Sequence, residues 1–279
     1  MRYAEGIEQV IALGDFPTPE EAAAYWNEGV AKAPFEDLSY TGGAGQPQAA
    51  RLYRGGGDAG TLLYIHGGGW AGGSIALHEP SAAGMALESG WDVLSISYRL
   101  APAHPYPAGL EDCRAALAWL AAKGGRIAIG GASAGANLAL ATALSTTHEL
   151  AGMVLFYGVF GDDFDTESYC AHAEGPGLTR ARMRDLFAMY DPDALRDELI
   201  APLKADLRGL PPALLVAAEV DVLLSENSAM AQALSGAGVP TTWHVEPGVT
   251  HGFINRGRLV PAANACISKA ANFLKETLT

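Results

Sequence analysis

The chain has 279 residues, of which 49% are hydrophobic, and this favours a folded domain with a sizeable core over a disordered chain. A formal net charge of −13 repels nucleic acid and anionic membrane surfaces, so neither is expected as a partner. The three cysteines, Cys113, Cys170 and Cys266, lack C-x-x-C spacing, which argues against a disulfide framework or a metal site. We therefore expect no metal and no other cofactor.

The N-terminal segment carries Glu5 and Glu8 where a secretion signal needs apolar residues. The longest apolar run, Leu150 to Phe160, is too short to span a bilayer and is typical of a buried strand. The sequence therefore predicts a cytoplasmic protein that does not insert into membranes.

Residues 1–34 predict two helices ahead of the first strand. Thr18-Pro19-Glu20-Glu21 is a typical helix start, and the second helix is expected to run through Trp26 and Val30. Because this segment precedes every strand, we interpret it as a helical cap.

Two short strands are expected next, around residues 38–41 and 49–53. Strands then alternate with helices: strands at 61–65, 92–98, 126–129, 153–159, 213–218 and 241–245, and helices near 78–89, 108–122, 134–145, 225–237 and 260–278. This alternation predicts one α/β domain over residues 1–279, with a mostly parallel eight-stranded sheet covered by helices on both faces. Residues 160–210 break the alternation and predict a cap insertion over the carboxyl ends of the strands.

The turn between the strand at 126–129 and its helix carries Gly131-Ala-Ser-Ala-Gly135. It fits the G-x-S-x-G nucleophile elbow, in which a serine sits exposed on a sharp strand-to-helix turn. The same pattern arises by chance in glycine-rich loops, and it overlaps a degenerate dinucleotide fingerprint. The cofactor interpretation needs an acidic residue at the end of the next strand, but that strand ends in Tyr157-Gly158.

Other residues that an acyl-transfer site needs also follow predicted strands. Asp221 follows the strand at 213–218, although an aspartate there could simply cap a helix. His251 follows the last strand, in a glycine-containing loop where core packing is the alternative. The chain order Ser133, Asp221, His251 is that of α/β-hydrolases.

His66-Gly67-Gly68-Gly69-Trp70 directly follows the strand at 61–65. Glycines let the backbone approach a substrate and leave N–H groups free for an oxyanion. A phosphate loop is the alternative, but no Gly-Lys-Ser/Thr follows. The backbone N–H of Ala134 would complete the oxyanion hole.

From about residue 60 onwards the chain resembles the hormone-sensitive-lipase-like, or HGGG, branch of the α/β-hydrolases. The matching segments are His66–Gly69, Ser97–Pro102, His104–Pro107, Glu111-Asp112, Gly131–Gly135, Leu210–Ala213, Glu219-x-Asp221 and His251–Phe253. The resemblance implies metal-independent hydrolysis of short-to-medium acyl esters through an acyl-enzyme, under a cap.

By position, the resemblance makes Ser133 the nucleophile, His251 the base and Asp221 the group that orients His251. The oxyanion would be bound by the N–H groups of Gly67, Gly68 and Ala134. His66 would fix the glycine loop, and Tyr98, Arg99 and Asp112 would serve as scaffold. Trp70 adjoins the loop and is a candidate contact for substrate.

The chain departs from this branch at Ala132, where an acidic residue is usual, and at Ala136, where glycine is common. The elbow and the His-Gly-Gly-x-Trp segment also resemble kynurenine formamidases, so an arylformamidase is the alternative enzyme. A catalytically silent receptor on the same fold is a further alternative, although such receptors lack the histidine that His251 supplies here. The sequence leaves a homodimer open and does not identify the natural ester.

Overall fold

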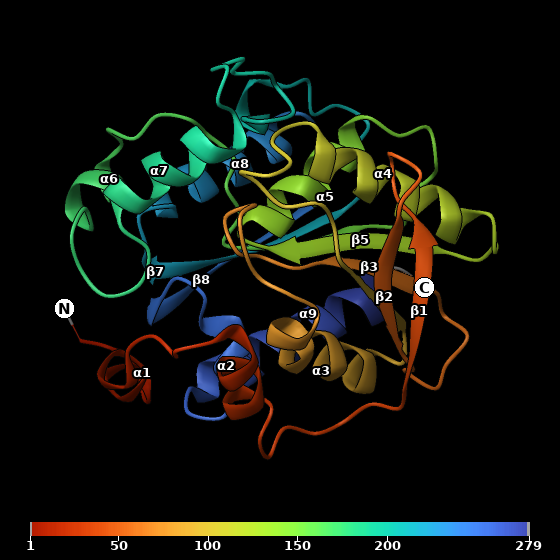
Figure 1. The fold of residues 1–279 in the computed structure, drawn as a ribbon, viewed down its shortest axis with the longest axis horizontal. Coiled ribbons are helices and arrows are strands. Elements are labelled where there is room, and N and C mark those ends of the chain that lie inside the picture. The colour runs from red at the N-terminus through yellow and green to blue at the C-terminus, as the bar shows by residue number, and fades with distance from the viewer. Residues whose placement is uncertain (1, 278–279) are drawn as a thin grey trace.

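The computed structural model describes residues 2–277. These residues fold around one sheet, whose strand order is β1-β2-β4-β3-β5-β6-β7-β8 (Figure 1). Strand β2 runs antiparallel to β1 and β4, and the remaining neighbours are parallel. The predicted mostly parallel sheet of eight strands is therefore confirmed. The strands are β1 (Phe35–Thr41), β2 (Pro47–Tyr53), β3 (Thr61–Ile65), β4 (Asp92–Ile96), β5 (Ile127–Ala132), β6 (Met153–Phe156), β7 (Ala213–Val220) and β8 (Thr241–Thr250).

Helices cover both faces of the sheet, as predicted (Figure 1). One face carries α4 (Ala108–Ala121), α5 (Ala134–Leu144) and α8 (Leu224–Gly236), and the other carries α3 (Glu79–Ser89) and α9 (Pro261–Thr277). Each layer has its own apolar cluster against the sheet, so all six residues of β5 are buried. Double coverage explains why the central strands are apolar throughout instead of alternating with polar residues.

The strands around the site differ in length from the prediction. Strand β5 continues through its glycines to the residue before Ser133, and β8 continues to the residue before His251. Strand β6 is shorter and ends at Phe156, because Tyr157 has a φ of 35° and turns the chain. The predicted end of the last helix at residue 278 lies outside the described residues.

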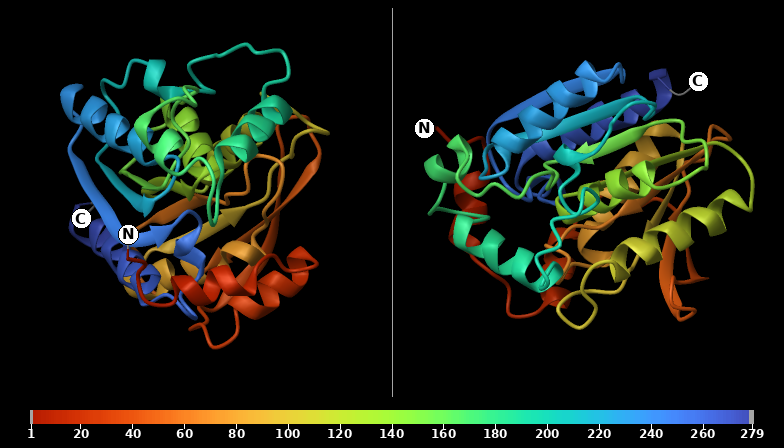
Figure 2. Two further views of the ribbon diagram at one scale, coloured as in Figure 1. Left: turned by 90° about the vertical axis from the view of Figure 1, so that its left-hand side faces the viewer. Right: turned by 90° about the horizontal axis from the view of Figure 1, so that it is seen from above.

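Four short helices gather at the end of the sheet toward which β5 points (Figures 1 and 2). These are α1 (Ile7–Leu13) and α2 (Pro19–Trp26) from the N-terminal segment, and α6 (Glu167–Ala171) and α7 (Arg180–Tyr190) from the insertion after β6. Helix α2 begins as predicted, with Thr18 Oγ1 accepting from the Glu21 N–H at 3.1 Å. It ends at Trp26 and does not reach Val30, because the following turn contains Gly29 at a φ of 75°.

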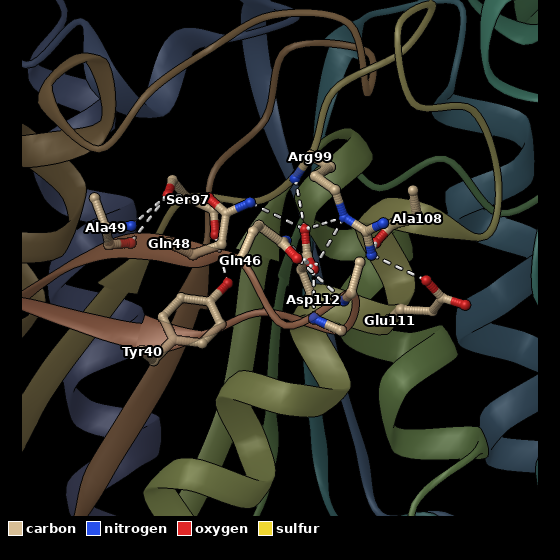
Figure 3. A network of polar contacts seen from close by, with 11 residues as sticks. Tyr40, Gln46, Gln48, Ala49, Ser97, Arg99, Ala108, Glu111 and Asp112 are labelled. Carbon is tan, nitrogen blue, oxygen red and sulfur yellow. Dashed lines mark hydrogen bonds and ion pairs between the residues drawn. The ribbon is translucent and has the colours of Figure 1, made fainter.

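Away from these helices, Asp112 of α4 ties the β1–β2 hairpin to the chain after β4 (Figure 3). The buried carboxylate accepts from the Gly43 N–H at 2.7 Å, from Gln46 and Gln48, and from both the backbone and the side chain of Arg99. Burial by itself would raise the pKa of Asp112, but the Arg99 hydrogen bonds and the other donors outweigh it and hold that pKa below its usual value.

Within residues 2–277, no helix combines the length and the apolar character needed to cross a membrane.

Candidate active site

Ser133 occupies a strained turn between the last residue of β5 and the first residue of α5. Its φ of 57° lies in the left-handed region, which a residue with a Cβ adopts at a cost, and its N–H donates to the Phe156 carbonyl at 2.9 Å. The turn is tight enough to require small neighbours: a Cβ on Gly131 would lie 2.5 Å from the Ile65 carbonyl oxygen, and one on Gly135 would overlap that same oxygen. This is the geometry of a nucleophile elbow.

Asp221, His251 and Ser133 form one hydrogen-bonded chain. His251 Nε2 lies 2.9 Å from Ser133 Oγ, and His251 Nδ1 lies 2.7 Å from Asp221 Oδ2. Asp221 directly follows β7, and its other oxygen accepts from the Leu223 N–H at 3.0 Å. Because a carboxylate only accepts, the His251 proton sits on Nδ1, which leaves Nε2 free to accept the proton of the serine.

The first glycine of the loop after β3 does not have a free N–H. The Gly67 N–H donates to His78 Nε2 at 3.1 Å, so the prediction that Gly67 serves the oxyanion hole is wrong. Within residues 2–277, the N–H groups of Gly68 and Gly69 meet no backbone or side-chain acceptor. The Ala134 N–H opens α5 and has no acceptor inside that helix. The available donors are therefore Gly68, Gly69 and Ala134.

His78, which no sequence motif marks, is buried at the start of α3 and holds the glycine loop in place. Its Nε2 accepts from Gly67, so its proton sits on Nδ1, which lies 2.9 Å from the side-chain amide of Asn255. The structure places the amide nitrogen of Asn255 at this position and leaves its buried oxygen without a partner, so we assign the amide the reversed orientation, in which its oxygen accepts from His78 Nδ1. Burial lowers the pKa of His78 well below its ordinary value, with smaller effects from His66 and Arg256. His78 is therefore neutral, as an acceptor must be.

His66 supports the same loop from the other side. Its Nδ1 donates to the Gly67 carbonyl at 2.9 Å, and its ring stacks on Tyr98 with a centroid separation of 4.4 Å. The Tyr98 hydroxyl donates to the His66 carbonyl at 3.0 Å. Burial lowers the pKa of His66 to about 4, only partly offset by the Gly67 hydrogen bond. These contacts are those of a residue that fixes the loop.

Trp70 does not line the cavity, which corrects its assignment as a substrate contact. The side chain is 1% exposed and stacks on Tyr190 of α7 with a centroid separation of 4.3 Å. Its Nε1 donates to Asn137 Oδ1 at 3.2 Å, and the Asn137 amide donates to the carbonyls of Val159 and Ile200. Trp70 therefore joins the glycine loop to α5 and to the insertion.

A cavity of about 340 Å³ opens above Ser133 and His251. The insertion supplies apolar walls through Leu178, Met183 and Leu186. The walls also include two arginines that were not predicted from the sequence, Arg182 of α7 and Arg256, five residues after His251. Position after the last strand was the only sequence signal that could have pointed to Arg256.

One cluster of possible metal ligands lies elsewhere, at His244, Glu246 and Cys266. On β8 and α9, His244 Nε2 lies 2.7 Å and Cys266 Sγ 3.1 Å from the Glu246 carboxylate, an arrangement that could hold a metal ion. Lys269 Nζ also lies 3.6 Å from this carboxylate, and burial and Glu246 raise the pKa of the Cys266 thiol. A protonated thiol beside an ammonium group disfavours a cation, and we interpret the group as a hydrogen-bond cluster.

Comparison with known proteins places this geometry in a family. The family model described as "alpha/beta hydrolase fold" matches residues 62–255, which include the glycine loop, Ser133, Asp221 and His251. The chain belongs to this family. It is 36% identical to "Carboxylesterase NlhH" of Mycobacterium tuberculosis over 78% of the chain and 73% of that protein. It is 31% identical to "Ethyl acetate hydrolase" of Pseudomonas putida over 87% of the chain and 82% of that protein.

Solved structures of the family agree over the whole α/β-hydrolase fold. A fungal esterase from Rhizomucor miehei superposes with a TM-score of 0.91 at 27% identity, over 99% of this chain and 97% of that one. The hyperthermophilic esterase from the archaeon Pyrobaculum calidifontis superposes with a TM-score of 0.88 at 30% identity, over 99% and 98%. The predicted α/β-hydrolase fold is confirmed.

Proposed function

We propose that this α/β hydrolase is a serine carboxylesterase that cleaves short-to-medium acyl esters through an acyl-enzyme on Ser133. One observation carries the proposal: Asp221, His251 and Ser133 are connected by hydrogen bonds of 2.7 and 2.9 Å. The similarity to proteins named carboxylesterase, carboxylic ester hydrolase and esterase supports the same reaction class.

In the first half-reaction, Ser133 Oγ attacks the ester carbonyl carbon while His251 Nε2 accepts its proton. Asp221 stabilises the imidazolium through its hydrogen bond to Nδ1. His251 then gives the proton to the leaving alkoxide, and an alcohol departs. In the second half-reaction a water, deprotonated by His251, attacks the acyl-enzyme and releases the carboxylic acid and Ser133.

The negative charge of each tetrahedral intermediate needs donors that are already in place. We assign this role to the N–H groups of Gly68, Gly69 and Ala134. His78 and His66 hold the loop through Gly67, so the donors are fixed before substrate arrives. Removing one oxyanion donor typically costs about 3 kcal/mol of transition-state stabilisation.

We further propose one domain over residues 1–279, in which segment 1–34 and the insertion at about 160–210 form a cap. The walls contributed by Leu178, Met183 and Leu186 support this role for the insertion. A cavity of about 340 Å³ lies at the small end of ligand sites, which supports compact esters as substrates. A cytoplasmic location and a homodimer stay predictions.

The test is a panel of acyl esters and N-formylkynurenine, assayed on the wild type and on Ser133→Ala. Ester turnover that is lost in the variant supports the proposal. Faster cleavage of N-formylkynurenine than of every ester would instead identify an arylformamidase. Absence of turnover, together with absence of fluorophosphonate labelling at Ser133, would identify a silent receptor.

A further inference from the structure

Arg256 is a charged residue of the cavity wall without an ion-pair partner. Within residues 2–277, no carboxylate lies within 4 Å of its guanidinium. Several other arginines do have a carboxylate within this distance: Arg51, Arg54, Arg99, Arg180, Arg184, Arg208 and Arg258. An arginine that is half-buried without a partner loses hydration and gains no ion pair in return. Its position therefore calls for an anion from outside the protein.

The Arg256 side chain is held in place by an aromatic ring. Its guanidinium carbon lies 4.2 Å from the centre of the Trp26 ring, and its backbone N–H donates to the Phe253 carbonyl at 2.8 Å. Burial lowers the pKa of Arg256, and the phenol of Tyr157 and the carboxylate of Asp15 act in the opposite direction. Asp15 lies in the exposed loop between α1 and α2, beyond ion-pair distance. The charge of Arg256 thus has only a distant counter-ion.

Arg258 provides the contrast two residues further on. It also lies over an aromatic ring, 3.9 Å from the centre of Tyr25. Its guanidinium, however, pairs with Glu28 at 2.7 Å and donates to the Tyr25 carbonyl. Arg258 does not line the cavity, whereas Arg256 does. The paired arginine fastens α2, and the arginine that faces the cavity is left unpaired.

A second arginine, from the insertion, also lines the cavity. Arg182 of α7 is exposed, lines the cavity and has no carboxylate within 4 Å among the described residues. The two residues that flank it at i−2 and i+2, Arg180 and Arg184, both contact Asp165. In a protein of net charge −13, which repels anions in general, two unpaired arginines create a local positive field at this cavity.

We propose that Arg256, assisted by the exposed Arg182, binds a carboxylate of the substrate, so that the preferred substrates are esters that carry a free carboxylate in addition to the ester group. The planar guanidinium matches a carboxylate through two parallel hydrogen bonds, and it is always charged. The carboxylate takes no part in bond breaking and only orients the ester over Ser133. This inference rests on the proposed ester hydrolysis.

The experiment uses pairs of esters in which an isopropyl group replaces the carboxylate. Monoethyl succinate against ethyl isocaproate places the charge on the acyl side, and 3-acetoxypropionate against isoamyl acetate places it on the alcohol side. A pH-stat gives kcat/KM for the wild type and for Arg256→Gln, Arg182→Gln and Arg258→Gln. The readout is the charged-to-neutral ratio of kcat/KM, so the intrinsic reactivity of each ester cancels between variants.

We expect Arg256→Gln to lower this ratio by about tenfold or more in one of the two pairs, mainly through KM. The pair that responds shows on which side of the ester the carboxylate lies. Arg182→Gln lowers the ratio less because its charge is exposed to solvent, and Arg258→Gln leaves the ratio as it is. Arg256→Lys keeps the charge but loses the planar guanidinium, so its ratio should lie between those of the wild type and Arg256→Gln. This variant keeps the test valid if Arg256→Gln does not fold.

If Arg256→Gln lowers the ratio by less than about tenfold in both pairs, the inference is overturned, as it is by an equal change in Arg258→Gln. Either result leaves ester hydrolysis intact. If the wild type cleaves neither the charged nor the neutral esters, the proposed function itself fails, which is a different outcome.

Discussion

The Asp112 network and the cavity above Ser133 both contain arginine, but the arginine is paired with carboxylates in the network and unpaired in the cavity. At Asp112, Arg99 donates to one buried carboxylate from its backbone and side chain and pairs with Glu111 as well (Figure 3). In the cavity, Arg256 and Arg182 have no carboxylate within ion-pair distance in the described chain. A charge paired within the protein stabilises the fold, whereas an unpaired charge at a cavity is available to a ligand.

The largest effect that separates the two regions is expected from Ser133→Ala. Loss of the nucleophile should lower kcat for esters by several orders of magnitude, since the remaining donors give only a small residual rate. The melting temperature should stay close to that of the wild type, because the change removes one hydroxyl at a strained turn. Steady-state kinetics measures the loss of kcat, and calorimetry measures the melting temperature. Ester turnover near the wild-type level would contradict the role of Ser133.

Asp112→Ala should have the opposite profile. The substitution leaves the donors of Arg99, Gln46 and Gln48 without their acceptor. Removing one partner of a buried ion pair typically lowers the free energy of unfolding by about 3–5 kcal/mol. Urea unfolding measures this loss. Under conditions where the variant is folded, kcat should remain near that of the wild type. A stable variant with reduced kcat would mean that the network serves the site and not the fold.

The buried histidines predict how stability depends on pH. The folded-state pKa of His66 is about 4, below the ordinary value of 6.5, so between these values the unfolded chain binds the proton and the folded chain does not. Stability contributed by His66 is therefore complete above pH 6.5 and is lost as the pH falls toward 4, by up to about 3 kcal/mol.

His66→Gln should flatten this part of the stability curve, as measured by urea unfolding at a series of pH values. Glu226 acts in the opposite sense, because burial raises its pKa, but it contributes equally to both proteins. Equal slopes in the variant and the wild type would contradict the assignment.

A smaller effect is expected from His78→Phe, which removes the acceptor of the Gly67 N–H. The loop that carries Gly68 and Gly69 would lose its fixed position, and kcat should fall by about 10- to 100-fold with little change in KM. Asn255→Ala should follow in the same direction with a smaller loss. Unchanged kcat in both variants would show that Gly67 needs no such support.

The sequence predicts best those features that depend on the order of strands and residues along the chain. Each strand of the parallel sheet was foreseen, and Ser133, Asp221 and His251 could be named because each follows a strand and parallel strands end at one edge. The structure places His251 within hydrogen-bond distance of both Asp221 and Ser133, while the catalytic roles of the three residues stay a prediction.

Contacts between distant segments were not predictable in this way. The acceptor of the Gly67 N–H comes from the start of α3, and the ring that faces Trp70 comes from α7. Nothing near Gly67 or Trp70 in the chain reveals these partners. The same holds for Arg256, whose significance depends on the absence of a nearby carboxylate in three dimensions, and therefore on the packing of the described fold as a whole.

The stacking of Arg256 on Trp26 has a consequence for how such enzymes diversify. The triad residues and the glycine loop all lie on the strands' carboxyl edge, whereas the ring that positions Arg256 comes from the first thirty or so residues, before any strand. Substitutions in that leading segment can thus redirect substrate preference while the reactive atoms stay where they are. Arg256 itself lies five residues after His251, but the ring that positions it is encoded far from the triad.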